Sequence, residues 1–226
     1  MGLGHSPRIV TDGLVLCLDA ANKRSYGGSG TTWTDLKGSN NGTLTNSPYF
    51  DENNGGSIVF DGSNEYIDLG SPSNIFSGIF GSNKISIGGW FKTSTTSPSS
   101  QKIVFDSGTT EVVQIDMASG GIAFRLGGPN TRISRVEPTA DKWFHFLGTY
   151  NGSSMIGYFN GSKYTESSGL TSNISSSDNG STMIAKYPGG GSYQFLGHVS
   201  QFCIYSKALT ADEIRQNYLA TKERYA

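Results

Sequence analysis

Charged residues are scarce in this sequence. They make up 15% of its 226 residues, and 17 lysines and arginines nearly balance 18 aspartates and glutamates. This balance provides neither the basic footprint of a nucleic-acid-binding protein nor a polybasic patch for a membrane surface. We therefore expect no nucleic-acid partner.

Long apolar runs are missing as well. No stretch of the sequence approaches the roughly 20 apolar residues that a membrane span needs. The N-terminal segment, residues 1–13, contains no apolar core of the length found in signal peptides. We therefore expect no membrane insertion, and we expect a soluble protein that is made in a cytoplasm.

Cysteine is rare and widely spaced. The two cysteines, Cys17 and Cys203, lie near opposite ends of the chain, each in a strand-like run. A disulfide is geometrically feasible if those two strands are neighbours. Two free thiols are favoured, because nothing in the sequence indicates an oxidising compartment.

The clearest structural signal is the stretch 143–164, WFHFLGTYNGSSMIGYFNGSKY. Its side chains alternate between two faces, and the alternation is interrupted at Asn151-Gly152 and Asn160-Gly161. An Asn-Gly pair favours the type I′ hairpin turn, which needs positive φ at both central residues. The stretch therefore predicts a three-stranded antiparallel meander.

Strand-like segments recur at intervals of roughly 8–15 residues between Leu14 and Tyr205, with no internal repeat. The first of them, 14–18, places its leucines on one face. Two regions lack such a pattern: 19–54, anchored by Trp33, and 71–82, a loop with a few apolar side chains. The pattern predicts one all-β antiparallel sandwich over residues 14–226, preceded by an N-terminal arm of residues 1–13.

One convincing helix is predicted, at residues 211–221. Thr210 is a good N-cap, and Glu213 completes a capping box. Ile214 and Tyr218 share one face, so we expect the helix to dock onto the sandwich by that stripe.

The order of these segments resembles the laminin G-like, concanavalin A-like jelly-roll family. The segments that carry the resemblance are SIVFDGSNEYIDLG, ISIGGWFK, DKWFHFLGTYNGSSMIGYFNGSKY and GHVSQFCIYSKALTADEIRQNY. The N-terminal GLVLCLDAANKRSYGGSGTTWTDLKGSNNGTLTN is similar to versions of the domain found in bacteriophage virion proteins. The resemblance implies a jelly-roll sandwich of two curved sheets with a role in binding or surface display. It does not by itself choose among carbohydrate binders, adhesion modules and virion proteins.

Glucanases share this jelly roll, so the resemblance also raises an enzymatic function. Their catalytic strand resembles Glu-Ile-Asp-Ile-Glu, whose carboxylates flank the glycosidic bond. The corresponding strand here, 114–118, keeps only Asp116, and one carboxylate cannot serve as both acid and nucleophile. The sequence therefore predicts that the protein is not an enzyme.

Calcium is the one cofactor that the resemblance suggests, since many relatives hold it through loop aspartates and carbonyl oxygens. The candidate ligands beside turns are Asp61, Asn64 and Asp106. A hairpin turn already explains Asp61-Gly62-Ser63-Asn64. The closing strand carries Ser200 and Gln201 where relatives carry acidic residues, which counts against calcium.

Carbohydrate binding requires exposed aromatic rings for stacking, with polar side chains nearby for hydroxyl groups. Trp90 and Trp143 lie in strong strands and are expected in the core. The candidate binding residues are Trp33, Asp106, Arg125, Tyr187 and Tyr193.

The leading interpretation is a phage virion surface protein that decorates a capsid or forms part of a tail or fibre. Its expected partners are copies of itself, other virion proteins and a host-surface glycan. The alternative interpretation is a free-standing carbohydrate-binding lectin.

Overall fold

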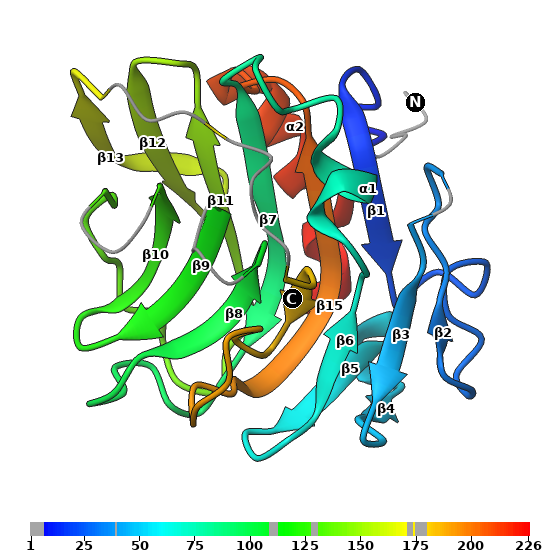
Figure 1. Cartoon of the computed structure of the whole chain (residues 1–226). Helices are drawn as coiled ribbons and strands as arrows, with labels where there is room; N and C mark the ends of the chain where they lie inside the picture. Colours follow the sequence, from blue (N-terminus) through cyan, green and yellow to red (C-terminus); the bar gives the residue numbers. More distant parts are fainter. Residues whose placement is uncertain (1–6, 39, 109–112, 128–130, 171–173, 175–179) are drawn as a thin grey trace.

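The computed structural model describes residues 7–38, 40–108, 113–127, 131–170, 174 and 180–226. Within these residues the chain forms two facing antiparallel sheets, as Figure 1 shows. This arrangement confirms the predicted all-β sandwich with a short C-terminal helix.

Sheet A contains eight strands of the described chain, with the order β13-β12-β11-β7-β15-β5-β4, and β1 also pairs with β15. Their bounds, in that order, are Ser162–Ser168, Ser154–Phe159, Phe144–Tyr150, Ile85–Lys92, Leu196–Tyr205, Ser57–Asp61, Tyr49–Asp51 and Leu14–Asp19. Strands β7 and β15, far apart in the sequence, are therefore neighbours at the centre of this sheet.

Sheet B contains seven strands of the described chain, in the order β10-β9-β8-β14-β6-β3-β2. Their bounds, in that order, are Gly121–Leu126, Val113–Ala118, Lys102–Asp106, Met183–Ile184, Tyr66–Asp68, Gly42–Thr45 and Thr32–Trp33. Two helices occur in the described residues, α1, Pro72–Phe76, and α2, Ala211–Thr221, and short 3-10 turns span Asn53–Gly55 and Lys222–Tyr225.

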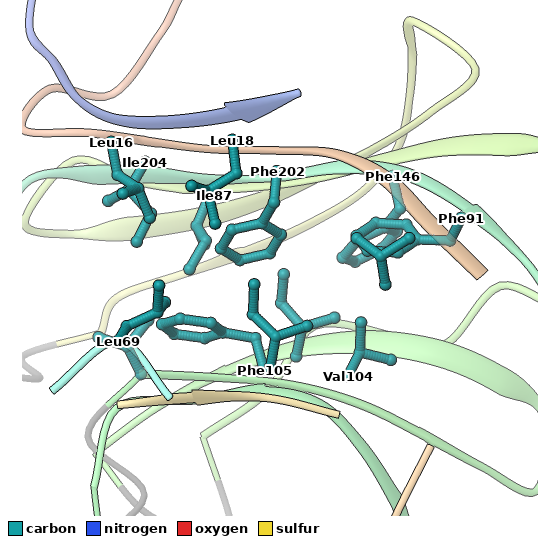
Figure 2. Packing of buried hydrophobic residues seen from close by; sticks show 14 of the residues in the cluster. Leu16, Leu18, Leu69, Ile87, Phe91, Val104, Phe105, Phe146, Phe202 and Ile204 are labelled. Carbon is teal, nitrogen blue, oxygen red and sulfur yellow. The ribbon is translucent and has the colours of Figure 1, made fainter. Parts of the chain in front are cut away.

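The main core lies between the two sheets. Figure 2 shows side chains from both sheets pointing toward one another across this layer. Phe105 of sheet B and Phe202 of sheet A stack with ring centroids 5.0 Å apart and an interplanar angle of 25°. Because the core takes every second residue of a strand, the intervening residues face outward.

The predicted meander forms as β11, β12 and β13. Its second turn has the expected type I′ signature, with φ of 49° at Asn160 and 75° at Gly161. The prediction for the first turn is wrong, because only Gly152 there has positive φ. Asn151 instead accepts hydrogen bonds at Oδ1 from the amides of Ser153 and Ser154.

Three further expectations require correction. The region 19–54 is not irregular, since it contributes β2, β3 and β4, and the loop 71–82 contains α1. A register shift between Leu14 and Leu16 moves Leu14 off the face that the leucines were expected to share. Leu16 joins the main core, and Leu14 joins a second apolar cluster.

That second cluster lies on the outer face of sheet A, beneath α2 (Figure 1). The predicted capping box of Thr210 and Glu213 is present, and Ile214 is fully buried in the cluster. Tyr218 stacks on Trp90 at 5.5 Å. The helix therefore docks by the stripe that the sequence predicted.

The two tryptophans that the sequence placed in the core, Trp90 of β7 and Trp143 just before β11, differ. Trp90 is buried as expected, and its indole N–H donates to Thr221 Oγ1 at 2.8 Å. Trp143 is only half-buried and packs against Tyr225, with ring centroids 4.9 Å apart. The C-terminal segment therefore covers the outer face of sheet A.

The described part of the predicted N-terminal arm, residues 7–13, packs on its own chain. The Val10 amide donates to Asn217 Oδ1 of α2 at 2.7 Å, and the Tyr205 hydroxyl donates to the Val10 carbonyl at 3.2 Å. Residues 1–6 lie outside the described residues. The boundary between arm and domain stays a prediction.

Candidate functional site

The outer face of sheet B carries polar side chains that alternate with core residues. On β9, Val113, Ile115 and Met117 are buried in the main core, so Gln114 and Asp116 lie on the opposite face. The register places Gln114 opposite both Asp106 of β8 and Arg125 of β10. Three neighbouring strands therefore bring these side chains to one surface.

Asp116 is the centre of this surface. Its carboxylate has no exposed area and accepts bonds from Arg125 Nε and Nη2, each at 3.1 Å. Arg135 Nη2 donates to the same carboxylate at 2.7 Å, and Gln101 Nε2 donates at 2.9 Å. Two guanidinium groups and an amide therefore satisfy this buried charge.

Arg135 is held in place by β10 and by the packing of the segment that carries it. Its Nη1 also donates to the Gly121 carbonyl at 2.6 Å. The hydroxyl of Tyr164 donates to the neighbouring Ser134 carbonyl at 3.0 Å. Burial raises the pKa of Tyr164, although the Arg135 cation opposes this effect, so the phenol stays a donor. The Arg135 guanidinium is thus positioned by a side chain that comes from outside the strands.

Gln114 and Gln101 extend the network across β8. Gln101 Nε2 donates to Gln114 Oε1 at 2.8 Å, and Gln114 Nε2 donates to Asp106 Oδ2. Gln101, Gln114 and Arg135 were not among the predicted site residues. Strand alternation could have paired Gln114 with Asp116, whereas Gln101 and Arg135 lie outside the strands and carried no comparable signal.

A hollow of about 190 Å³ opens above one end of this network, lined by Gln101, Ile103, Tyr187 and Tyr193. The two tyrosine rings lie 5.8 Å apart with an interplanar angle of 87°. Tyr193 is 40% exposed. The Ile103 amide donates to the Tyr193 carbonyl at 2.7 Å, which ties the tyrosine-bearing segment to the edge of β8.

Gln101 connects the hollow to the charged network, since it lines the first and donates to the second. The hollow therefore combines two aromatic rings with an amide group whose orientation is fixed. Small-molecule sites typically have this character, with apolar walls and a few placed polar groups.

Of the five predicted carbohydrate-binding residues, Tyr187 and Tyr193 line the hollow. Asp106 and Arg125 lie on the same face but are buried in the network behind it, with 0% and 7% exposure. The role predicted for Trp33 is wrong, because its side chain has no exposed surface on which a sugar could stack. Trp33 instead belongs to the main core, which matches its expected role as an anchor for the region around it.

The predicted calcium ligands are not gathered into one group. Asp61 Oδ1 accepts from the Ser63 amide at 2.7 Å, which is the local bonding of a tight turn. Asp106 lies on β8 of the other sheet, bonded to Gln114. Within the described part of the chain, no group of three or more His, Cys, Asp or Glu side chains could hold a metal ion.

Several solved structures share the fold. Trypanosoma rangeli sialidase matches with a TM-score of 0.69 and 15% identity, over 98% of this chain and 36% of the sialidase. Domain 4 of an extracellular arabinanase from Geobacillus stearothermophilus, solved with arabinotriose, matches with a TM-score of 0.67 and 17% identity, over 92% of this chain and 98% of that domain. The binding domain of botulinum neurotoxin serotype G gives 0.67 and 16%, over 91% and 50% respectively.

These matches correct one prediction. The prediction that the protein is not an enzyme is contradicted, because the matching structures include glycosidases, a sialidase and an arabinanase. The chain spans about a third of the sialidase, 36% of its length. At these identities the likeness shows a common fold.

No curated protein sequence matches this chain. None of the helices in the described residues is long and apolar enough to cross a membrane. The model of the laminin G-like family described as the concanavalin A-like lectin/glucanases superfamily matches residues 61–215, more than half of the chain. The sandwich topology and this match together place the chain in a known family. The chain belongs to the concanavalin A-like lectin/glucanases superfamily.

Proposed function

We propose that the outer face of sheet B binds carbohydrate, with the hollow between Tyr187 and Tyr193 as the point of contact. The observation that carries this proposal is the role of Gln101. Its side chain lines the hollow and donates to Asp116 at 2.9 Å and to Gln114 at 2.8 Å. A side chain held by two partners presents a fixed polar surface.

The chemistry of the hollow suits a sugar. The C–H faces of a pyranose or furanose ring are apolar and can pack on an aromatic ring, whereas its hydroxyl groups need donors and acceptors. Tyr193 is 40% exposed and provides the first kind of surface. Gln101 provides the polar atoms that the hydroxyl groups need. Because the network behind Gln101 is already formed, little ordering of side chains is needed on binding. The arabinanase domain with a similar fold was solved with arabinotriose, which supports a sugar ligand.

Replacing Tyr193 or Tyr187 by alanine should lower glycan affinity about tenfold or more, because each change removes a ring that lines the hollow. A glycan array with the full chain identifies the ligand, and isothermal titration calorimetry with each variant then measures the loss.

Tyr49→Ala is the matched control. Tyr49 is 59% exposed and lies on β4, at the edge of the other sheet. Its replacement should leave the affinity unchanged. If all three variants bind the glycan equally well, or all three lose the same affinity, the hollow is not the binding site.

We further propose that the chain acts as a surface component of a bacteriophage particle, made in the host cytoplasm. There it would assemble with copies of itself and with other virion proteins and present the carbohydrate-binding face to a host glycan. The resemblance of residues 13–46 to virion versions of the domain supports this role. In this arrangement, sheet B remains free for the glycan, and other surfaces of the sandwich provide the assembly contacts.

The chain should therefore sediment with purified phage particles and be identified in them by mass spectrometry. Light scattering on the isolated chain should give a discrete oligomer, since virion components assemble by symmetric contacts. If the chain stays in the particle-free supernatant and is monomeric, the virion role fails, and a free-standing lectin takes its place.

A further inference from the structure

The two cysteines face each other across sheet A. Cys17 of β1 lies directly opposite Cys203 of β15, and their Sγ atoms are 3.5 Å apart. Both are free thiols and both are buried, with 2% and 6% exposure. The contact joins positions 186 residues apart in the sequence.

The backbone around Cys17 shows which kind of strand pair this is. Its amide donates to Asp35 Oδ1 at 2.9 Å, and its carbonyl accepts from the Leu36 amide at 2.9 Å. Both backbone groups thus bond away from β15, so the two cysteines form a non-hydrogen-bonded pair. In such pairs the Cα atoms lie about 4.5 Å apart. A disulfide accepts Cα separations of about 4.4 to 6.8 Å, so the bond fits without moving the strands.

The two thiols line different pockets, although both side chains are buried. Cys17 lines a hollow of about 610 Å³ that Arg8, Arg24 and Arg224 also line. Arg224 is paired there with Asp19 at 2.9 Å, and the other two guanidinium groups leave the hollow positively charged. Cys203 lines a small pocket of about 10 Å³. The hollow brings an anionic reagent next to Cys17, whose own side chain is 2% exposed and has Asp19 and Asp35 near the thiol pair.

We propose that Cys17 and Cys203 form an oxidative modification site that closes into an intramolecular disulfide by exchange with an anionic low-molecular-weight disulfide such as oxidised glutathione. The Cys17 thiol loses its proton to solvent and its sulfur attacks the glutathione disulfide. One glutathione thiolate leaves, and Cys17 carries a mixed disulfide. The Cys203 sulfur, after losing its proton, then attacks Cys17 Sγ and releases the second glutathione. The dithiol is oxidised, and one glutathione disulfide is reduced to two thiols.

The order of the two steps follows from the geometry. The Cys203 thiol donates its hydrogen to Cys17 Sγ, and this bond, together with burial, raises the pKa of Cys203 well above its usual range. Cys203 therefore stays protonated until Cys17 has reacted. Glutathione disulfide carries several carboxylates, which suit the arginine-lined hollow next to Cys17.

The bond should stabilise the fold considerably. It links the first strand to the last and closes a loop of nearly the whole chain, which reduces the entropy of the unfolded state. We expect the melting temperature of the oxidised chain to exceed that of the reduced chain by roughly 10 °C.

The test treats the reduced full chain with glutathione redox buffers and follows it by thiol titration, intact mass and peptide mapping. We expect both thiols to disappear together, with a Cys17–Cys203 peptide, the loss of two hydrogens, no dimer, and reversal by dithiothreitol. Cys203→Ser should stop at a glutathione adduct on Cys17. Cys17→Ser should leave Cys203 unmodified.

Three outcomes would overturn the proposal. In the first, the thiols of the native chain resist oxidation. In the second, disulfides form between molecules in place of the internal bond. In the third, the oxidised chain melts no higher than the reduced chain. The wild-type titration distinguishes these outcomes from the internal bond even where a serine variant fails to fold.

Discussion

Replacing Asp116 by alanine should lower the free energy of unfolding by about 3 to 5 kcal/mol. The Asp116 carboxylate is fully buried and accepts hydrogen bonds from Arg125 and Arg135, whose side chains are only 8% and 9% exposed. Its removal leaves two guanidinium groups with little water and without their shared partner. Urea unfolding monitored by tryptophan fluorescence measures the loss.

An exposed ion pair provides the control. Lys163 and Glu166 form a salt bridge on β13, with side chains 49% and 36% exposed. Lys163→Ala should cause no measurable change, because water already solvates that pair. A loss of less than about 1 kcal/mol for Asp116→Ala would show that the network contributes little beyond what exposed pairs do.

Asp116→Ala should also weaken glycan binding, since Gln101 loses a hydrogen bond that fixes its side chain at the hollow. The two effects separate in a variant that keeps the charge network. Gln101→Ala should reduce affinity while leaving most of the stability intact, because Asp116 would retain both arginines. A structural effect and a binding effect would then be assigned to different side chains.

Local sequence patterns predicted the parts of the fold that depend on neighbouring residues. The capping box of α2 needs only Thr210 and Glu213, and the meander needs only alternation and turns. The strands within 19–54 escaped prediction because they are short. β2 has two residues, and it exists because Thr32 and Trp33 pair with Thr43 and Gly42. Such pairing depends on the tertiary fold, and no local period marks it.

The site was predicted in its residue types more than in its geometry. Tyr187 and Tyr193 stand six positions apart in a loop, and their shared hollow depends on the Ile103 amide that bonds to the Tyr193 carbonyl. Trp33 was misassigned because a glycine-rich neighbourhood suggests an exposed loop. Its indole is in fact fully buried. Exposure of an aromatic side chain depends on which distant segments cover it.

Acid should destabilise this protein through His145. The imidazole is 3% exposed and packs against the edges of both Trp90, at 5.3 Å, and Tyr218, at 5.9 Å, beneath α2. Its Nδ1 has no hydrogen-bond partner among the described residues. Burial lowers the pKa of His145 from 6.5 to about 4, since the charged form would lose its water.

The sign of the effect follows from proton binding. Between about pH 6.5 and pH 4 the unfolded chain binds a proton at His145 that the folded chain does not. The free energy of unfolding therefore falls as the pH falls through this window. Lowering the pH from about 6.5 to about 4 should lower the free energy of unfolding by about 3 kcal/mol, because each pH unit contributes about 1.4 kcal/mol.

Urea unfolding at about pH 7 and about pH 4, with wild type and His145→Phe, isolates this contribution from that of the carboxylates. Phenylalanine keeps an aromatic ring against Trp90 and Tyr218 and cannot titrate. The variant should lose less stability on acidification than wild type, and the difference should approach about 3 kcal/mol. Parallel losses in the two proteins would mean that His145 already reaches water in the native state. A nuclear magnetic resonance titration of the imidazole would then show a pKa near 6.5 instead of near 4.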